Sequence, residues 1–255
     1  MQIQLPYFDI ILARLESGDP EFVEAFHRHV HFGAYFGNES PAEAMEQLTQ
    51  LLIDLAEIQP GEAVLDVGCG FGGTLMSLKE QFPANALTGL NIDPRQLEVA
   101  RRRCPGVDFV QGDACAMPFP DASFDRVLAV ECIFHFPSRR AFFEHARRVL
   151  RPGGNLTLCD FVVPEGTPPG SYDHTTEMLW GRHTAIEIPE YRALAAEVDL
   201  QLTASEDISP QVLPSYDFLG GLLGRYLPVA GEVTRLSKFF MEMGGIGYSL
   251  LRFDL

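Results

Sequence analysis

Residues 63–76, AVLDVGCGFGGTLM, constrain the fold more than any other part of the sequence. The branched apolar residues at the start predict a short strand buried on both faces of a sheet. Four glycines follow between positions 68 and 73, and a helical pattern covers residues 74–80. Glycines allow a positive φ and a close approach of a ligand, and a helix start offers unpaired N–H groups. The segment therefore predicts a nucleoside-cofactor site.

The acid inside the strand, Asp66, indicates which nucleoside is bound. Gly68, Gly70 and Gly73 have the G-x-G-x-x-G spacing of dinucleotide folds. A carboxylate two residues before the first glycine would repel a pyrophosphate, whereas it would attract a cationic ligand. S-adenosylmethionine (SAM) carries a sulfonium and an ammonium group. The sequence LDVGCGFGG resembles the first motif of the class I SAM-dependent methyltransferases, and this resemblance favours SAM, with a nicotinamide-dependent (NAD(P)) oxidoreductase as the alternative.

Predicted strands and helices alternate from residue 63 onward, which is typical of a parallel sheet with crossover helices. The expected fold class is therefore α/β, a Rossmann-like doubly wound, mostly parallel seven-stranded sheet. After residues 63–67, strands are expected at 86–92, 107–110, 124–131, 155–161, 200–207 and 246–253. After residues 74–80, helices are expected at 94–103, 139–150, 189–198, 212–227 and 232–243.

Residues 1–60 precede the sheet and show helical spacing at 7–15, 20–30 and 41–58, with Asp19 and Ser40 as expected N-caps. The connector HVHFGAYFG at residues 29–37 is more aromatic than a plain linker requires. Its histidines alternate, so they would not share one face of a helix, and no metal site is predicted. We expect an N-terminal helical lid, with a packed helical layer as the alternative. The remaining core, residues 61–255, would carry an inserted cap at about residues 162–230.

The net charge limits the partners that are expected, and the cysteine content indicates the cellular compartment. The formal net charge is −16, whereas nucleic-acid binding depends on clustered Lys and Arg, so a nucleic-acid partner is not expected. The five cysteines are scattered without a C-x-x-C pair, which fits reduced thiols in a cytoplasmic protein. The N-terminus has no signal-peptide pattern, and no apolar run approaches the roughly 18 residues of a membrane span.

Residues 60–161 resemble the class I SAM-dependent methyltransferases. The resemblance rests on the glycine turn, on Gly112-Asp113-Ala114 and on Leu150-Arg151-Pro152-Gly153-Gly154. It implies that Asp113 and Ala114 recognise adenine. Asn91 stands where the family usually has an acid for the ribose hydroxyls, and it forgoes a charge-assisted bond. The residues expected to bind SAM are Asp66, Gly68, Cys69, Gly70, Gly72, Asn91, Ile92, Gln96, Asp113, Ala114 and Glu131.

Within that family, residues 130–137 (VECIFHFP) resemble the small-molecule branch of tocopherol, sterol and natural-product sugar O-methyltransferases. O-methylation requires the loss of a hydroxyl proton, and the pKa of histidine suits a general base. His135, after the fourth predicted strand, is the expected base. Asp160, after the fifth, is expected to orient His135 or to bind substrate. For both residues a purely structural role is the alternative.

Aromatic and apolar residues of the cap and lid favour a small, largely apolar acceptor, such as a specialised metabolite or a lipid-like molecule, and a place in the core is the alternative for most of them. The third alternative, beside transferase and oxidoreductase, is a SAM-fold protein that binds the cofactor without methyl transfer. The oligomeric state is left open. The aromatic and apolar residues in question are Tyr172, Met178, Trp180, Tyr191, Tyr216, Phe218, Tyr226, Phe239 and Phe240.

Overall fold

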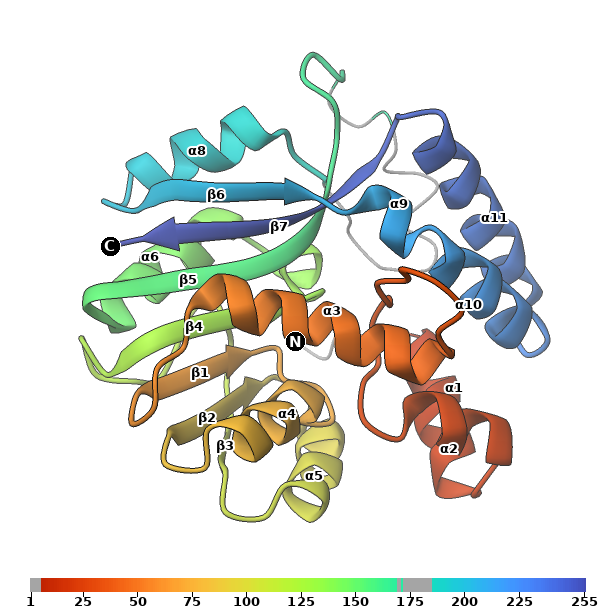
Figure 1. Cartoon of the computed structure of the whole chain (residues 1–255), viewed down its shortest axis with the longest axis horizontal. Coiled ribbons are helices and arrows are strands. Elements are labelled where there is room, and N and C mark those ends of the chain that lie inside the picture. Colours follow the sequence, from red (N-terminus) through yellow and green to blue (C-terminus); the bar gives the residue numbers. More distant parts are fainter. Residues whose placement is uncertain (1–5, 169–170, 172–184) are drawn as a thin grey trace.

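The computed structural model describes residues 6–168, 171 and 185–255 of the chain. Its centre is a seven-stranded sheet in the order β3-β2-β1-β4-β5-β7-β6, which confirms the predicted α/β fold (Figure 1). The strands are β1 (Ala63–Val67), β2 (Ala86–Asn91), β3 (Asp108–Gln111), β4 (Phe124–Val130), β5 (Leu150–Val162), β6 (Gln201–Asp207) and β7 (Gly247–Asp254).

The direction of the strands places the ligand-binding edge of the sheet. Strands β1 to β5 pair in parallel, and β7 is antiparallel to both of its neighbours. The strand order reverses where β1 lies between β2 and β4. Open α/β sheets bind ligands beyond the carboxyl ends of the strands at such a switch point. Asp66 lies near the end of β1, and Glu131 directly follows β4.

Helices cover both faces of the sheet (Figure 1). Because side chains alternate along a strand, Val64 enters the apolar cluster shared with α3, α4 and α5, and Leu65 enters the cluster shared with α6 and α8. The helices are α1 (Pro6–Glu16), α2 (Pro20–Phe26), α3 (Pro41–Ala56), α4 (Gly73–Gln81), α5 (Pro94–Arg103), α6 (Arg139–Val149), α8 (Ile188–Ala196), α9 (Ser209–Val212), α10 (Pro214–Gly224) and α11 (Pro228–Glu242), with a short 3-10 turn η1 (Ile133–His135).

A third group of helices, α1, α2, α10 and α11, lies beyond the carboxyl ends of the strands (Figure 1). Both predicted N-caps are confirmed: Asp19 accepts a hydrogen bond from the Glu21 amide, and Ser40 forms a capping box with Glu43. The helix predicted to reach residue 30 ends at Phe26 instead. From there the chain runs over the start of α4 with its histidines turned inward, which a continued helix would not allow.

The segment predicted as a cap, residues 162–230, divides between two layers. Helix α8 packs on the sheet and β6 is its edge strand, whereas α9 and α10 lie at the ligand-binding end with α11. The helix predicted at 212–227 corresponds to α10, which begins at Pro214 and ends at Gly224, and the short helix α9 precedes it. The predicted cap residues Tyr172, Met178 and Trp180 lie outside the described residues.

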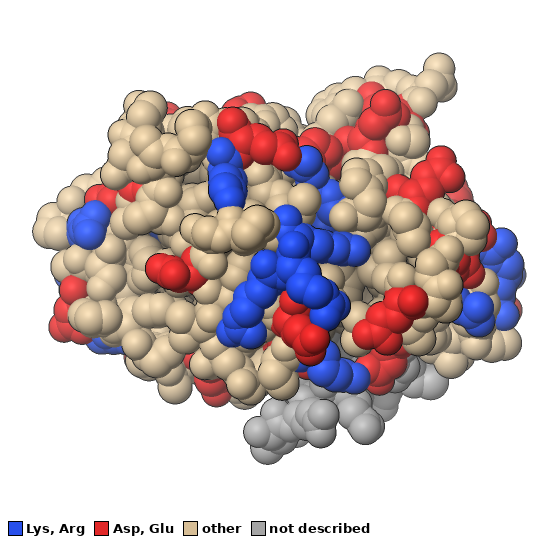
Figure 2. Space-filling model, turned by 90° about the horizontal axis from the view of Figure 1, so that it is seen from below, with Lys and Arg blue, Asp and Glu red and all other residues tan. Residues whose placement is uncertain are grey.

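The surface of the described chain carries both signs of charge. Figure 2 shows basic side chains in a band across one face, with acidic side chains among and beside them. In α5, for example, Arg102 forms an ion pair with Glu98 at 2.8 Å. Among the helices that the structure describes, none has the length and apolar character to cross a membrane. Within these same residues, no three His, Cys, Asp or Glu side chains gather as a metal site would require.

Candidate active site

The glycine turn between β1 and α4 adopts a backbone that larger residues tolerate poorly. Gly68, Gly70 and Gly72 have φ values of 72°, 52° and 82°. A Cβ atom on Gly68 would lie 2.6 Å from the Cβ atom of Cys132, which is shorter than any ordinary contact. A side chain at Gly68 would therefore force the end of β4 away from the turn.

A large cavity opens beside this turn, at the carboxyl ends of β1, β2 and β4. Its volume is about 600 Å³, which is in the range of small-molecule and cofactor sites. It brings together eleven of the thirteen residues that the sequence predicts for the site. These are Asp66, Gly68, Cys69, Gly70, Asn91, Ile92, Gln96, Asp113, Ala114, Glu131 and His135.

Asp66 is the most unusual polar group at the cavity. Asp66 is 2% exposed, and its Oδ2 atom has no hydrogen-bond partner among the described residues. Burial raises the pKa of this carboxyl to about 8. An unpaired buried carboxyl is costly, and a cationic ligand removes that cost by supplying its counter-charge. The site therefore fits a cofactor with a positive group near β1.

The ends of β2 and β3 provide the next polar groups. The Asn91 amide donates to Oε1 of Gln96 at 2.8 Å, so the two side chains are held together and the Asn91 oxygen is oriented. Asp93 caps α5 through the Arg95 amide, as predicted. Asp113 accepts a hydrogen bond from the Cys115 amide at 2.8 Å and lines the cavity beside Ala114. The cavity thus offers neutral amides at one position, and the carboxyl groups of Asp66, Asp93, Asp113 and Glu131 also line it.

The Asn91–Gln96 pair leads to a first prediction. Replacing Asn91 by aspartate should tighten SAM binding about threefold to tenfold, because a charge-assisted bond to a ribose hydroxyl is roughly twice as strong as a neutral one. Gln96 can rotate its amide to donate to the new carboxylate. Titration calorimetry with SAM measures the change. Unchanged or weaker binding would mean that the ribose does not lie at the end of β2.

Two predicted site residues, Gly72 and Asp160, do not line the cavity. A Cβ atom on Gly72 would lie 3.3 Å from the Cβ atom of Ala100, so Gly72 serves the packing of the turn against α5. Asp160 is fully buried, and its Oδ2 accepts from Arg139 at 3.0 Å and from the Tyr191 hydroxyl. The structure therefore corrects the prediction for Asp160, because its carboxylate is committed to these partners rather than to His135.

His135 ends the 3-10 turn that follows β4, and it lines the cavity. Its Nε2 atom lies 3.0 Å from the hydroxyl of Tyr7, which comes from the first turn of α1. Burial raises the pKa of the Tyr7 phenol well above its usual range, so the hydroxyl keeps its proton. The contact joins the N-terminal helices to the expected base. Sequence reasoning missed Tyr7, since its only local signal is an apolar position on a helix.

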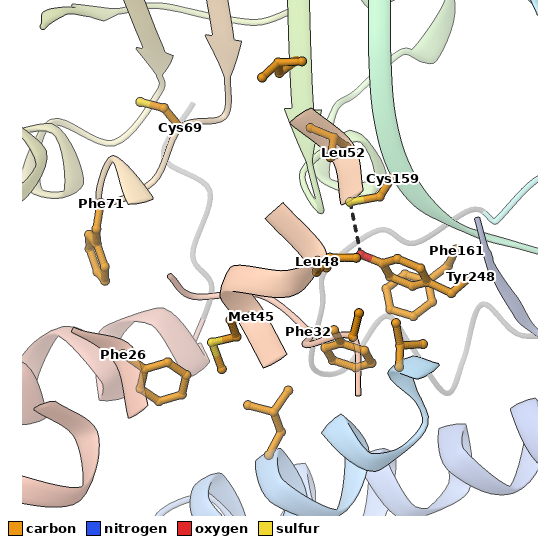
Figure 3. Packing of buried hydrophobic residues seen from close by; sticks show 14 of the residues in the cluster. Phe26, Phe32, Met45, Leu48, Leu52, Cys69, Phe71, Cys159, Phe161 and Tyr248 are labelled. Carbon is orange, nitrogen blue, oxygen red and sulfur yellow. Dashed lines mark hydrogen bonds between the residues drawn. The ribbon is translucent and has the colours of Figure 1, made fainter. Parts of the chain in front are cut away.

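Glu131 connects three parts of the chain at the cavity. Its Oε1 accepts hydrogen bonds from the Phe32 amide at 2.9 Å and from the Tyr248 hydroxyl at 2.5 Å. Its backbone has a positive φ of 45°, which is uncommon for a residue other than glycine. Burial raises the pKa of the carboxyl to about 7. Tyr248 also donates to Cys159, and the rings of Phe32, Phe161 and Tyr248 pack around these contacts (Figure 3).

The aromatic lining of the cavity differs from the prediction. The structure shows that six of the residues proposed for the cap and lid do not line it, which agrees with the alternative of a place in the core: Tyr191, Tyr216, Phe218, Tyr226, Phe239 and Phe240. Most of the lining rings come instead from the N-terminal helices and the strand ends. These rings are Tyr7, Phe8, Phe26, Phe32, Phe71, Phe134, Phe136 and Phe161.

The N-terminal segment is fixed to the core by buried polar groups. His29 donates from Nε2 to Glu46 at 2.8 Å, and Glu46 accepts from Ser77 of α4 at 2.7 Å. The Phe32 carbonyl can only accept, so Nδ1 of His31 donates to it at 2.7 Å. Nε2 of His31 lies 3.1 Å from the Thr49 hydroxyl, and burial lowers the pKa of His31, so the ring stays neutral and Nε2 acts as an acceptor.

This network predicts a loss of stability in acid. Burial lowers the pKa of His31 from 6.5 to about 3. The unfolded chain therefore binds a proton that the folded chain does not, and stability falls as the pH drops from 6.5 towards 3 by up to about 1.4 kcal/mol per pH unit. Urea unfolding across this range measures the fall. The variant His31→Gln should show a shallower slope, and an equal slope would contradict the assignment.

Comparison with known proteins places the chain among enzymes. Residues 65–158 match the model of the methyltransferase domain. Methyltransferase GfsG of Streptomyces halstedii is 35% identical over 251 residues, which cover 89% of this chain and 87% of that protein. The 27-O-demethylrifamycin SV methyltransferase of Amycolatopsis mediterranei is 32% identical over 243 residues, which cover 88% of each chain.

Solved structures share the fold at low sequence identity. The [4+2]-cyclase SpnF superposes with a TM-score of 0.82 at 20% identity, over 97% of this chain and 94% of that chain. A geranyl diphosphate methyltransferase in complex with GPP and sinefungin superposes with a TM-score of 0.80 at 17% identity, over 98% and 99% of the two chains. At these identities the similarity concerns the fold alone.

Proposed function

The chain belongs to the SAM-dependent methyltransferases, and from this premise we propose that it methylates a hydroxyl group of a small, largely apolar molecule. The observation that carries the cofactor half of the proposal is the buried, unpaired Asp66 carboxyl beside the glycine turn. The acceptor half rests on the apolar cavity that continues from this turn to Tyr7 and His135.

The cofactor residues are assigned by their place along the cavity. Asp66 would hold the positively charged methionine end, and the glycine turn would let the backbone approach it. Asn91 and Gln96 would hold the ribose. Asp113 and Ala114 would face the adenine. The other proposed contacts are Gly68, Cys69, Gly70 and Ile92.

The chemistry requires alignment and the removal of one proton. SAM, when bound, supplies an electrophilic methyl group. Holding the acceptor oxygen in line with it contributes an effective molarity of about 10⁵ to 10⁸ M. His135 would take the hydroxyl proton at Nε2, where Tyr7 now forms its hydrogen bond. The N-terminal segment, with Phe26 and Phe32 in the wall, would act as the lid that excludes water.

The relatives support the class of acceptor. One of them is named for 27-O-demethylrifamycin SV, and others are named for sterols. The first name places the methyl group on oxygen, whereas the sterol enzymes are named as 24-C-methyltransferases, so oxygen is proposed from the first relative and from His135 at the cavity. We therefore propose a specialised metabolite or lipid-like acceptor, with methylation on oxygen.

The test is a transfer assay with SAM carrying a radiolabelled methyl group. The panel contains phenols, glycosylated aromatics, sterols, quinones and macrolide aglycones, each with and without the enzyme. We expect label in at least one hydroxyl-bearing member. Firm SAM binding in calorimetry, with no transfer to any member, would favour a protein that uses the SAM fold for a different reaction.

A further inference from the structure

Part of the cavity lining is apolar, and the groups around it indicate which kinds of acceptor can bind there. We call this part the acceptor chamber, and the name rests on the proposed function. Its aliphatic and aromatic members belong to one buried cluster contributed by α1, α2, η1, β5 and α10. They are Ile11, Phe26, Phe134, Phe161, Leu219 and Leu223.

The positive side chains at the cavity already have carboxylate partners. Arg95 pairs with Asp93 at 2.6 Å and with Asp9 at 2.9 Å. Arg28 forms a bidentate ion pair with Glu80, with Nη2 to Oε1 at 2.7 Å and Nη1 to Oε2 at 2.9 Å. These are the Arg and Lys residues among the described residues that line the cavity, so none of them is available for a ligand phosphate or carboxylate.

Two carboxyl groups at the cavity, by contrast, have an oxygen without a partner among the described residues. Both hydrogen bonds to Glu131 go to Oε1, from Phe32 and Tyr248. No described residue donates to Oε2, and Glu131 lines the cavity. Asp66 has an unpartnered oxygen as well. The net charge of +1 on SAM would balance one of these two carboxyls, and the other would remain for the acceptor.

We propose that the acceptor chamber selects molecules without a negative charge, and that Glu131 is the residue that enforces this selection. An acceptor hydroxyl can donate to Oε2, whereas a phosphate, sulfate or carboxylate would be repelled by it. The repulsion is strong because the surrounding side chains are apolar and screen charge poorly. Glu131 is thus a specificity residue for the acceptor, although the sequence suggested a role in cofactor binding.

The ionisation of Glu131 depends on the groups that face it. Above its pKa of about 7 the carboxylate is charged, and selection against anions is strongest there. Tyr7 and Tyr216 keep their protons because burial raises the pKa of both phenols. The titratable groups around Glu131 are Tyr7 from α1, Cys132 after β4, Cys159 and Asp160 from β5, Tyr216 from α10 and Tyr248 from β7.

The test uses two fluorescent probes with one skeleton, N-phenyl-naphthylamine, which is neutral, and anilinonaphthalene sulfonate, which carries one sulfonate. Each is titrated into the full chain with saturating S-adenosylhomocysteine, about one pH unit above the Glu131 pKa of about 7. We expect the neutral probe to bind at least about tenfold more tightly, since one unfavourable charge contact of this kind changes affinity by that order. In Glu131→Gln the ratio should fall to about threefold or less. Glutamine keeps an oxygen for Phe32 and Tyr248.

The controls separate charge from folding. Glu144→Gln removes an exposed carboxylate on α6 that pairs with Arg140 at 3.5 Å, and it should leave the ratio unchanged. Leu223→Trp fills the chamber and should weaken both probes. Thermal unfolding verifies that Glu131→Gln is folded, because the sulfonate probe also binds partly unfolded chains.

Several results would overturn the proposal. They are equal or tighter binding of the sulfonate probe to the unmodified protein, an unchanged ratio in folded Glu131→Gln, and the absence of binding by either probe. No methyl group is transferred in this experiment. Its failure therefore leaves the proposed O-methylation standing, and a negative transfer assay leaves the binding ratio interpretable.

Discussion

Replacing Asp66 by asparagine should weaken SAM binding about 10- to 150-fold. The buried carboxyl has no partner of its own among the described residues, so the cofactor would supply its counter-charge. A hydrogen bond to a charged group contributes about 1.5–3 kcal/mol, which corresponds to this range of affinity. Titration calorimetry with SAM measures the loss.

The same variant should behave differently without the cofactor. Burial raises the pKa of Asp66 from 3.8 to about 8, so the folded chain holds a proton that the unfolded chain releases. The stability of the free protein should therefore fall as the pH rises from about 4 to 8, and Asp66→Asn should lack this part of the fall.

This combination separates a binding role from a folding defect. We expect Asp66→Asn to unfold at the same or a higher temperature than the parent protein at pH values near 8. Saturating SAM should raise the unfolding temperature of the parent more than that of the variant at the same concentration. A variant that is folded and binds SAM with the parent affinity would remove Asp66 from the site.

Replacing His135 by alanine should lower kcat about 10²- to 10⁴-fold while SAM affinity stays within about twofold. This is the usual contribution of a general base, and His135 lines the cavity from the 3-10 turn that follows β4. The measurement is steady-state kinetics with an acceptor from the transfer panel, paired with calorimetry on the same protein.

Tyr7→Phe is the matched variant for this prediction. It keeps the ring and removes only the hydrogen bond to Nε2 of His135. The acceptor hydroxyl has to replace this hydrogen bond before Nε2 can take its proton, so kcat of Tyr7→Phe should stay at or above the parent value. Full activity of His135→Ala would return this histidine to a packing role. Another group would then remove the hydroxyl proton of the acceptor.

Much of the fold was predictable because its signals are local. The strand, the glycines and the helix of residues 63–81 are adjacent in sequence, and so are the caps at Asp19 and Ser40. Alternating strands and helices indicated the sheet. The carboxyl ends of parallel strands meet at one edge, so Asp66, Asn91, Asp113 and His135 were correctly expected to share one site.

The parts that were not predictable depend on contacts between residues that are far apart in the sequence. Tyr7 meets His135 across 128 positions, and no local pattern reports such a contact. Asp160 was expected at the site because it ends a strand. Arg139 and Tyr191 approach it only in the folded chain and satisfy its carboxylate. Of the chamber aromatics, Phe26 comes from the predicted N-terminal lid, whereas Phe134 and Phe161 come from η1 and β5, outside the cap and lid where sequence reasoning sought them.

The structure explains how Asn91 can take the place of an acid at the end of β2. The sequence showed an amide where related proteins usually carry an acid. The structure adds that Gln96 holds this amide in place from the first turn of α5. The proposed ribose position is therefore preorganised although it lacks a charge, and the unpaired Asp66 carboxyl would provide the charged contact instead.

The most direct test of the central claim is the position of the transferred methyl group. The enzyme is incubated with carbon-13 methyl-labelled SAM and an acceptor from the panel, and the product is examined by carbon NMR. We predict a methoxy carbon, coupled through oxygen to the former hydroxyl position of an uncharged acceptor. A label on carbon or nitrogen would contradict O-methylation and the role of His135 as the group that removes a hydroxyl proton.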